Sequence, residues 1–235
     1  MRHAFRFAAL AWSSLALAGA ACAGTVQLTV TDKEGNPVPD VVVLIESSAK
    51  AAAVPAPAPV VIVQEGSRFV PFLSVVPAGS TLRFVNRDSY DHHVRSTPSG
   101  PLGNLPPVAD FELRLDAGAA APASPNDEYK SSGPARKRSG TSSADVKVVK
   151  AGAIGLGCHI HASMRGQVYV SGSPWFGKTD ANGTLSIDGV PDGAAEASLW
   201  HPDQLTEQPL LRMQVSTTPA KLDAQLNFTP RRRRG

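Results

Sequence analysis

The sequence is short of cysteine, aromatic residues and charge, and these shortages exclude several classes of protein. Only two of its 235 residues are cysteines, Cys22 and Cys158, which excludes a disulfide scaffold and a cysteine-rich zinc module. Aromatic residues make up 6% of the chain and charged residues 18%. After the N-terminal segment, no stretch reaches about 18 consecutive apolar residues, so no membrane-spanning helix is predicted there.

The small positive charge of the chain is concentrated at its two ends. The formal net charge is +3, but Arg2 and Arg6 lie in a segment that resembles a cleaved leader. Without them 21 basic residues remain, four of which form the run 231–234, so the body carries 17 basic against 20 acidic residues. A nucleic-acid-binding body is therefore not expected.

Hydrophobic residues make up 42% of the chain, which also has 20 glycines and 20 prolines. This composition favours short strands joined by turns. Apolar residues alternate in many short segments, as in Val26, Leu28 and Val30, and no segment shows a persuasive helical period. We predict an all-β chain, built as sandwiches. The predicted strands are 25–31, 41–45, 60–64, 68–76, 80–85, 110–115, 145–149, 167–171, 184–187, 195–200, 210–216 and 222–228.

Residues 1–23 have the pattern of a secretory signal peptide. Basic residues precede a short apolar stretch, and Ala21-Cys22-Ala23 is an A-x-A cleavage signal. We expect export to the periplasm or outside the cell, with cleavage near Ala23 and no stable membrane insertion afterwards. Cys158 then remains as the one cysteine of the mature chain, and it has no intramolecular disulfide partner.

Four segments lack the alternation of strands. Residues 49–59 form an Ala/Pro linker, 86–107 a loop, 116–143 a flexible insertion, and 229–235 a disordered basic tail.

A candidate metal-binding loop lies just before the predicted strand 167–171. Cys158, His161 and Met164 follow the spacing C-x2-H-x2-M, so a tight loop could turn a thiolate, an imidazole and a thioether toward one point. These donors suit copper in both of its oxidation states. A trigonal site with a weak axial Met needs one more histidine, which His92 or His93 could provide after the strand 80–85.

The pattern N-x5-H-x-V followed by C-x2-H-x2-M resembles that of type 1 blue-copper cupredoxins, especially plastocyanin- and amicyanin-like domains. The resemblance implies a Greek-key β-sandwich that binds one copper ion per chain and transfers single electrons to a redox partner protein. Aligning Asn86 and Val94 with the pattern implies His92, Cys158, His161 and axial Met164 as ligands. His93 then occupies a position where the family has Asn, whose backbone N–H hydrogen-bonds the cysteine sulfur. Asn86 and His93 are thus candidates for supporting roles beside the ligands.

The flanking segments resemble a second module. Residues 24–45 are similar to the first hairpin of a carboxypeptidase-regulatory-like, or transthyretin-like, β-sandwich, and residues 178–202 to its later strands. The resemblance implies that a cupredoxin domain, 55–171, is inserted between two parts of this sandwich, 24–50 and 172–228. Bacterial periplasmic proteins labelled methylamine-utilisation proteins have a similar layout.

We therefore expect a periplasmic electron carrier. Two alternatives remain: a copper-delivery protein that uses the same donors, and a carbohydrate- or protein-binding sandwich that uses Trp175, Phe176 and Trp200. We do not expect an enzyme, because the sequence has no motif of nucleophilic, phosphate-binding or zinc-protease chemistry. We expect His159 to be a solvated or supporting imidazole. We expect His201 to end a strand.

Overall fold

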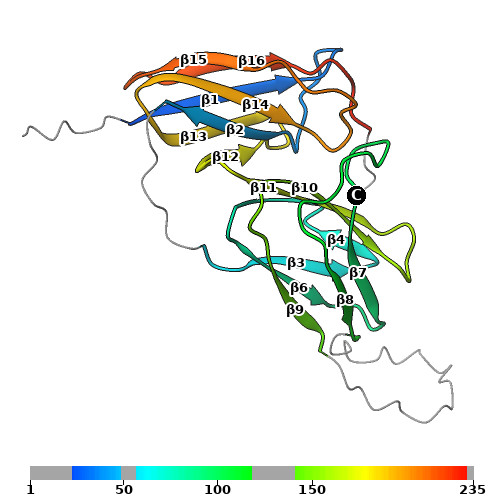
Figure 1. Ribbon diagram of the computed structural model, residues 1–235. Helices are drawn as coiled ribbons and strands as arrows, with labels where there is room; N and C mark the ends of the chain where they lie inside the picture. The colour runs from blue at the N-terminus through cyan, green and yellow to red at the C-terminus, as the bar shows by residue number, and fades with distance from the viewer. Residues whose placement is uncertain (1–22, 49–56, 118–140, 232–235) are drawn as a thin grey trace, which may run out of the picture.

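The computed structural model describes residues 23–48, 57–117 and 141–231. The predicted signal peptide up to residue 22, most of the predicted Ala/Pro linker, residues 118–140 of the predicted insertion and the last four residues of the predicted basic tail lie outside the described residues. The described strands form four sheets, which pair into two β-sandwiches, one above the other in Figure 1. The prediction of an all-β chain is therefore confirmed for these residues.

One sandwich, here called the terminal sandwich, takes its strands from both ends of the chain. A three-stranded sheet, β13-β1-β16, faces a four-stranded sheet, β12-β2-β14-β15. Strand β1 lies between β13, to which it is antiparallel, and β16, to which it is parallel. The strands are β1 (Ala23–Thr31), β2 (Val42–Ser47), β12 (Trp175–Lys178), β13 (Thr184–Pro191), β14 (Gly193–Trp200), β15 (Leu211–Val215) and β16 (Ala220–Gln225).

The other sandwich, here called the central sandwich, is built from the middle of the chain. A five-stranded sheet, β5-β11-β10-β7-β8, faces a four-stranded sheet, β4-β3-β6-β9. Its strands are β3 (Val60–Glu65), β4 (Arg68–Val70), β5 (Leu73–Pro77), β6 (Thr81–Asn86), β7 (His92–Thr97), β8 (Glu112–Leu115), β9 (Ser143–Lys147), β10 (Gly152–Cys158) and β11 (Arg165–Ser171).

Each sandwich has its own apolar core, produced by the alternation seen in the sequence. In β1, Val26, Leu28 and Val30 are buried while the residues between them are more exposed. In the central sandwich, Phe84 and Leu156 are among the largest buried side chains. Cys158 and Met164 belong to this second core, so the candidate metal loop is attached directly to it.

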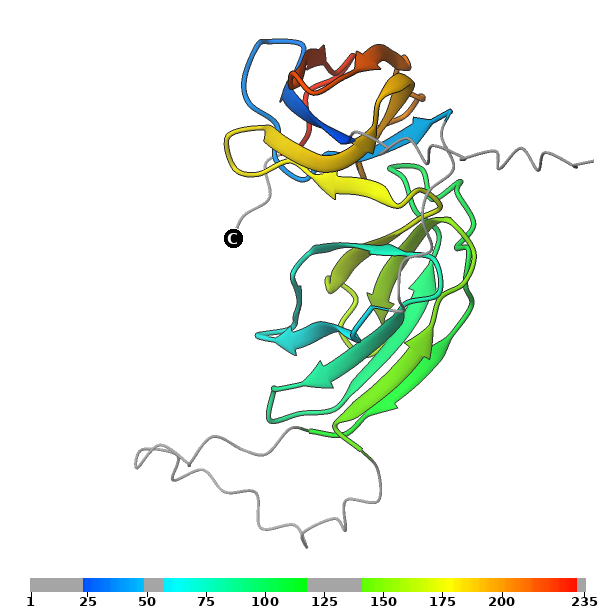
Figure 2. The same cartoon turned by 90° about the vertical axis from the view of Figure 1, so that its left-hand side faces the viewer.

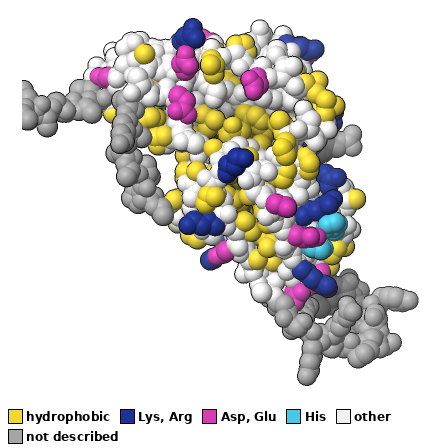
Figure 3. Space-filling model, viewed as in Figure 1, with side chains coloured by type: hydrophobic (Ala, Val, Ile, Leu, Met, Phe, Trp, Pro, Cys, Tyr) yellow, Lys and Arg dark blue, Asp and Glu magenta, His cyan; other side chains and the backbone are white. Residues whose placement is uncertain are grey.

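A smaller apolar cluster joins the two sandwiches. The rings of Tyr169 from the central sandwich and Trp200 from the terminal one lie 4.9 Å apart. Lys178 Nζ contacts Asp40 Oδ1 at 2.6 Å and donates to the carbonyl oxygen of Leu73 at 3.2 Å, which links β12 to β5. In the view of Figure 3, hydrophobic side chains are visible where the two sandwiches meet. Trp200 is only 8% exposed in this cluster, so most of its surface packs between the two sandwiches.

Several local predictions were wrong. The predicted strand 68–76 is divided into β4 and β5, and residues 92–97, assigned to a loop, form β7. The strands β10 and β12 were missed, because the small residues of β10 and the mixed residues of β12 show no alternation. Residues 24–45 are not a hairpin: β1 and β2 lie in opposite sheets.

Two of the missed strands build the candidate metal site. β7 and β10 are antiparallel neighbours within the five-stranded sheet, and Cys158 pairs with Val94. The start of β7 and the end of β10 therefore lie at the same edge of the sheet, which brings His92 beside Cys158. Figure 2 shows the same sandwich after a 90° turn about the vertical axis. Within the described ranges, the structure contains no helix that could cross a lipid bilayer.

Candidate metal centre

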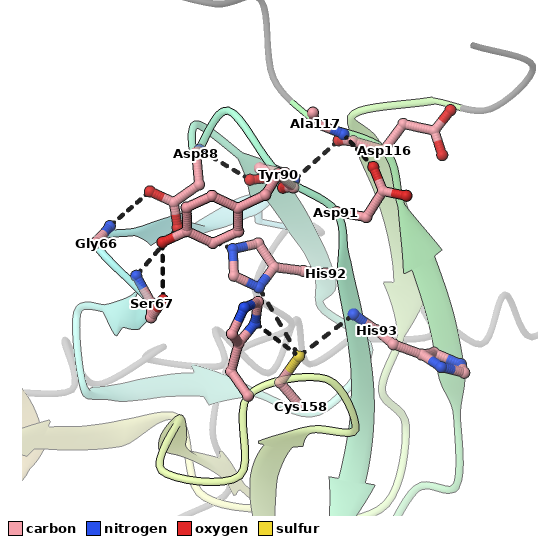
Figure 4. A network of polar contacts seen from close by, with 12 residues as sticks. Gly66, Ser67, Asp88, Tyr90, Asp91, His92, His93, Asp116, Ala117 and Cys158 are labelled. Atoms are coloured by element: carbon pink, nitrogen blue, oxygen red, sulfur yellow. Dashed lines mark hydrogen bonds and ion pairs between the residues drawn. The ribbon is translucent and has the colours of Figure 1, made fainter. Parts of the chain in front are cut away.

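Three of the four predicted ligands converge at the edge of the central sandwich. The thiol sulfur of Cys158 lies 3.8 Å from His92 Nδ1 and 3.7 Å from His161 Nδ1 (Figure 4). The three donor atoms all lie within 4.8 Å of one another. Residues separated by 66 positions in the sequence thus form one compact cluster of a thiol and two imidazoles.

The cluster is closed on one side and more open on the other. Cys158 is 3% exposed and His92 is fully buried, whereas His161 is half-buried. Beside His161, Ile160 is 55% exposed and Ala162 is also exposed. The site therefore approaches solvent through the loop that carries His161.

Asp88 orients the imidazole of His92. Its Oδ2 lies 2.8 Å from His92 Nε2, and its carboxylate also accepts hydrogen bonds from the backbone N–H groups of Gly66 and Ser67 at 2.7 and 3.0 Å. An ionised carboxylate can only accept, so His92 carries its proton on Nε2. The lone pair of Nδ1 then faces the sulfur of Cys158, as metal ligation requires.

The ionised state of Asp88 is favoured by these contacts. Burial alone would raise the pKa of Asp88, but the two backbone N–H groups and His92 outweigh that effect and lower the pKa below its ordinary value. At neutral pH the carboxylate is therefore charged and available to His92.

The backbone of β7 contacts the cysteine sulfur. The N–H of His93 points to Cys158 Sγ at 3.4 Å, and the N–H of His159 donates to the carbonyl oxygen of His93 at 3.0 Å. The imidazole of His93 points away from the sulfur (Figure 4). Any residue except proline could donate this backbone contact, so a histidine at position 93 is compatible with it.

The loop between β10 and β11 carries the other two predicted ligands. The N–H of Met164 donates to the carbonyl oxygen of His161 at 2.9 Å, which makes the loop a tight turn. Met164 is 1% exposed and packs in the same apolar core as Cys158. The turn therefore places the methionine inside the sandwich, while Ile160 and Ala162 remain outside.

Asn86 holds the loop that leads to His92. Its side-chain amide donates to the carbonyl oxygens of Tyr90 and Asp116 at 2.8 and 2.9 Å, and its Oδ1 accepts from the backbone N–H of Asp88 at 2.9 Å. Asn86 is 2% exposed. These hydrogen bonds hold the backbone before His92 and do not involve the His92 side chain.

Tyr90 covers the two imidazoles. Its ring centroid lies 5.3 Å from that of His92 and 5.1 Å from that of His161, and its hydroxyl contacts the Ser67 hydroxyl at 2.8 Å. Sequence reasoning missed both Tyr90 and Asp88. The available signal was their position, two and four residues before His92, but spacing alone does not show that a loop folds back over the ring.

The distances fit a single small metal ion. With a metal–thiolate bond of about 2.3 Å, metal–imidazole bonds of about 2.0–2.1 Å and angles near 120°, sulfur and nitrogen lie roughly 3.7–3.8 Å apart. The two observed sulfur–nitrogen distances are 3.8 and 3.7 Å. Two imidazoles and one thiolate in a trigonal set are the donors of copper electron-transfer sites, in which a methionine is a weak axial ligand. Met164 is buried in the same apolar core as Cys158. The residues present therefore fit copper.

His201, outside this site, directly follows strand β14 and is 2% exposed. Its Nδ1 accepts the backbone N–H of Asp203 at 3.1 Å, and its ring packs 5.7 Å from that of Phe228. These contacts are those of a structural residue.

Solved structures similar to this chain include several cupredoxins. Amicyanin from Paracoccus versutus is 19% identical, with 55% of this chain and 97% of that chain covered and a TM-score of 0.32. A purple cupredoxin from Nitrosopumilus maritimus is 18% identical, with 48% and 99% covered and a TM-score of 0.33. No family model and no curated protein matches the sequence.

A copper-containing nitrite reductase from Thermus scotoductus SA-01 is also similar. It is 20% identical, with 54% of this chain covered and a TM-score of 0.35. This chain spans a quarter of the length of that enzyme. At such identities and TM-scores we base the assignment of the site on its side chains and not on these similarities.

Proposed function

We propose that this protein is a type 1 copper protein that carries single electrons. His92, Cys158 and His161 would hold the ion in a trigonal set, and Met164 would be its weak axial ligand. The observation that carries the proposal is the pair of sulfur–nitrogen distances, 3.8 and 3.7 Å, in a buried thiol–imidazole cluster. When bound there, copper would supply a one-electron couple between its cuprous and cupric states.

The chain's own residues would keep the donors in one arrangement. Cys158 and His92 are attached to adjacent strands of the sheet, and Asp88 fixes the orientation of the imidazole. Since the donors are positioned before the ion binds, a change of oxidation state requires little movement of the protein. Such rigidity favours fast electron transfer.

The closed site favours a carrier of electrons over a carrier of copper. A copper-delivery protein needs an open site from which the ion exchanges, but His92 is fully buried and Cys158 is 3% exposed. The sequence also has only 3 Met and no His-rich tract.

We place the exit for the electron at His161. It is the least buried of the three clustered donors, and Ile160 beside it exposes 55% of its surface. An apolar patch beside a half-buried ligand offers a redox partner protein a small, transient interface. The signal-peptide pattern of residues 1–23 supports a periplasmic or secreted location for this exchange. In this role the protein is not itself an enzyme.

Spectroscopy and voltammetry test this function together. Mature protein mixed with one equivalent of Cu²⁺ should show an intense visible absorption from thiolate-to-copper charge transfer and a type 1 EPR signal. Voltammetry should then show one reversible one-electron wave. A colourless copper complex would contradict the proposal and favour copper delivery.

The substitution Met164→Leu tests the axial ligand. Leucine fills a similar volume in the core, so the fold and the visible band should be retained. Loss of the thioether disfavours the cupric state and should raise the reduction potential by roughly 60 mV, the change that a tenfold shift in a one-electron equilibrium produces. Voltammetry measures the shift. An unchanged potential, or complete loss of copper, would show that Met164 is not a weak axial ligand.

A further inference from the structure

A second cluster of metal-binding side chains lies outside the proposed copper site. The Nε2 atoms of His93 and His159 contact the same carboxylate oxygen, Glu112 Oε1, at 2.9 and 3.1 Å. The two imidazole rings lie 4.9 Å apart. The side chains of His93, His159 and Glu112 are 33%, 44% and 56% exposed, so solvent ions can reach them.

The sheet builds this cluster from three adjacent strands. His93 lies on β7, Glu112 begins β8 on one side of it, and His159 follows the end of β10 on the other side. The backbone bond from His159 to His93 continues the β10–β7 ladder by one residue. Because side chains alternate along a strand, His93 faces outward where His92 faces the core. Histidine side chains are visible at the surface of the central sandwich, next to acidic and basic ones (Figure 3).

The proposed copper site does not account for these side chains. His93 donates its backbone N–H toward Cys158, while its imidazole points away (Figure 4). Two imidazoles and one carboxylate form a donor set that suits borderline divalent ions such as Zn²⁺ and Cu²⁺.

We propose that His93, Glu112 and His159 form a second, surface site for a divalent ion of the Zn²⁺ and Cu²⁺ class. The ion would take the place of the two Nε2 protons that now point to Glu112 Oε1, so that each neutral imidazole would carry its proton on Nδ1. The exposed side chains would then close around the ion by rotation. The proposal goes beyond electron transfer and does not depend on it, since it uses none of the four proposed copper ligands.

The surrounding charges predict moderate affinity. Arg95 lies opposite Glu112 in the ladder between β7 and β8, and Arg114 lies opposite His93. Arg114 is itself paired with Asp91 at 3.2 Å, which partly neutralises it. We therefore expect binding weaker than at the buried site, but specific to these three side chains.

Zinc titration of metal-free protein, followed by equilibrium dialysis, tests the second site. Zn²⁺ is redox-silent and accepts both donor sets, so the unaltered protein should bind two ions. Glu112→Gln and His159→Asn should each weaken binding of the surface ion at least tenfold. Cys158→Ser should instead weaken binding of the ion at the proposed copper site and leave the surface ion in place. The matched control is Glu196→Gln, which removes an exposed carboxylate paired with Arg212 in the terminal sandwich and should change neither.

NMR tests where the surface ion binds, independently of the number of bound ions. The imidazole resonances of His93 and His159 should shift with the weaker equivalent of Zn²⁺ and should remain unshifted in Glu112→Gln. Equal zinc binding by the unaltered protein and Glu112→Gln, or an absence of imidazole shifts, would overturn the second site. A loss of copper colour in Glu112→Gln would also contradict it, because the two sites would not be separate. Failure of the Cys158→Ser comparison alone would count against the proposed function and not against this site.

Discussion

Cys158→Ser should remove the visible charge-transfer band completely. The band requires a copper–thiolate bond, and a serine hydroxyl cannot form one at neutral pH. Serine is close to cysteine in size, and Cys158 lies at the end of β10, so the fold should be retained. Absorption and EPR spectra of the copper-loaded variant measure the loss, and circular dichroism verifies the fold.

The matched control is Ser163→Ala on the same loop, where the side chain is exposed and no metal role is proposed. It should keep the band at full intensity. If Cys158→Ser instead remained coloured, the thiolate could not be the source of the band and the type 1 site would be wrong.

The adjacent histidines should respond in opposite ways to substitution. His92→Ala should abolish the visible band, because it removes one of three donors from a site that Asp88 has oriented. It also removes one hydrogen bond that the ionised, half-buried Asp88 carboxylate accepts, which should cost about 1.5–3 kcal/mol of folding free energy. His93→Ala should keep the band in altered form, since the backbone N–H that contacts the sulfur remains.

Visible spectra of the two copper-loaded variants make this comparison, and thermal unfolding shows that each is folded. Added imidazole, which can enter the space left in His92→Ala, should restore part of the band. The reverse pattern, with the band lost in His93→Ala and kept in His92→Ala, would assign the ligand to His93.

Much of the fold could be predicted from local patterns. Alternating apolar residues, as at Val26, Leu28 and Val30, indicated strands because one face of each strand must be buried. The strands that were not predicted have the same explanation. In β10, residues 153–158 are all buried and small residues dominate, so no alternation marks a strand that lies inside the sheet.

For the site, the short spacing of Cys158, His161 and Met164 was informative, because a loop of this length keeps its residues close together in any fold. The contribution of His92 depends on sheet pairing across 66 residues, which spacing cannot determine. Asp88 and Tyr90 carried no recognisable pattern. Both residues lie on a loop that Asn86 holds in place. In this loop Asp88 contacts Nε2 of His92, and the ring of Tyr90 packs against the same imidazole.

By itself, the sequence determined the all-β class, the chemistry of the donors and which residue types could bind copper. Only the tertiary structure decided which histidine faces the sulfur. Adjacent residues on a strand point to opposite faces, so the register of β7 against β10 sends His92 into the core toward Cys158. The same register sends His93 outward to Glu112 and His159.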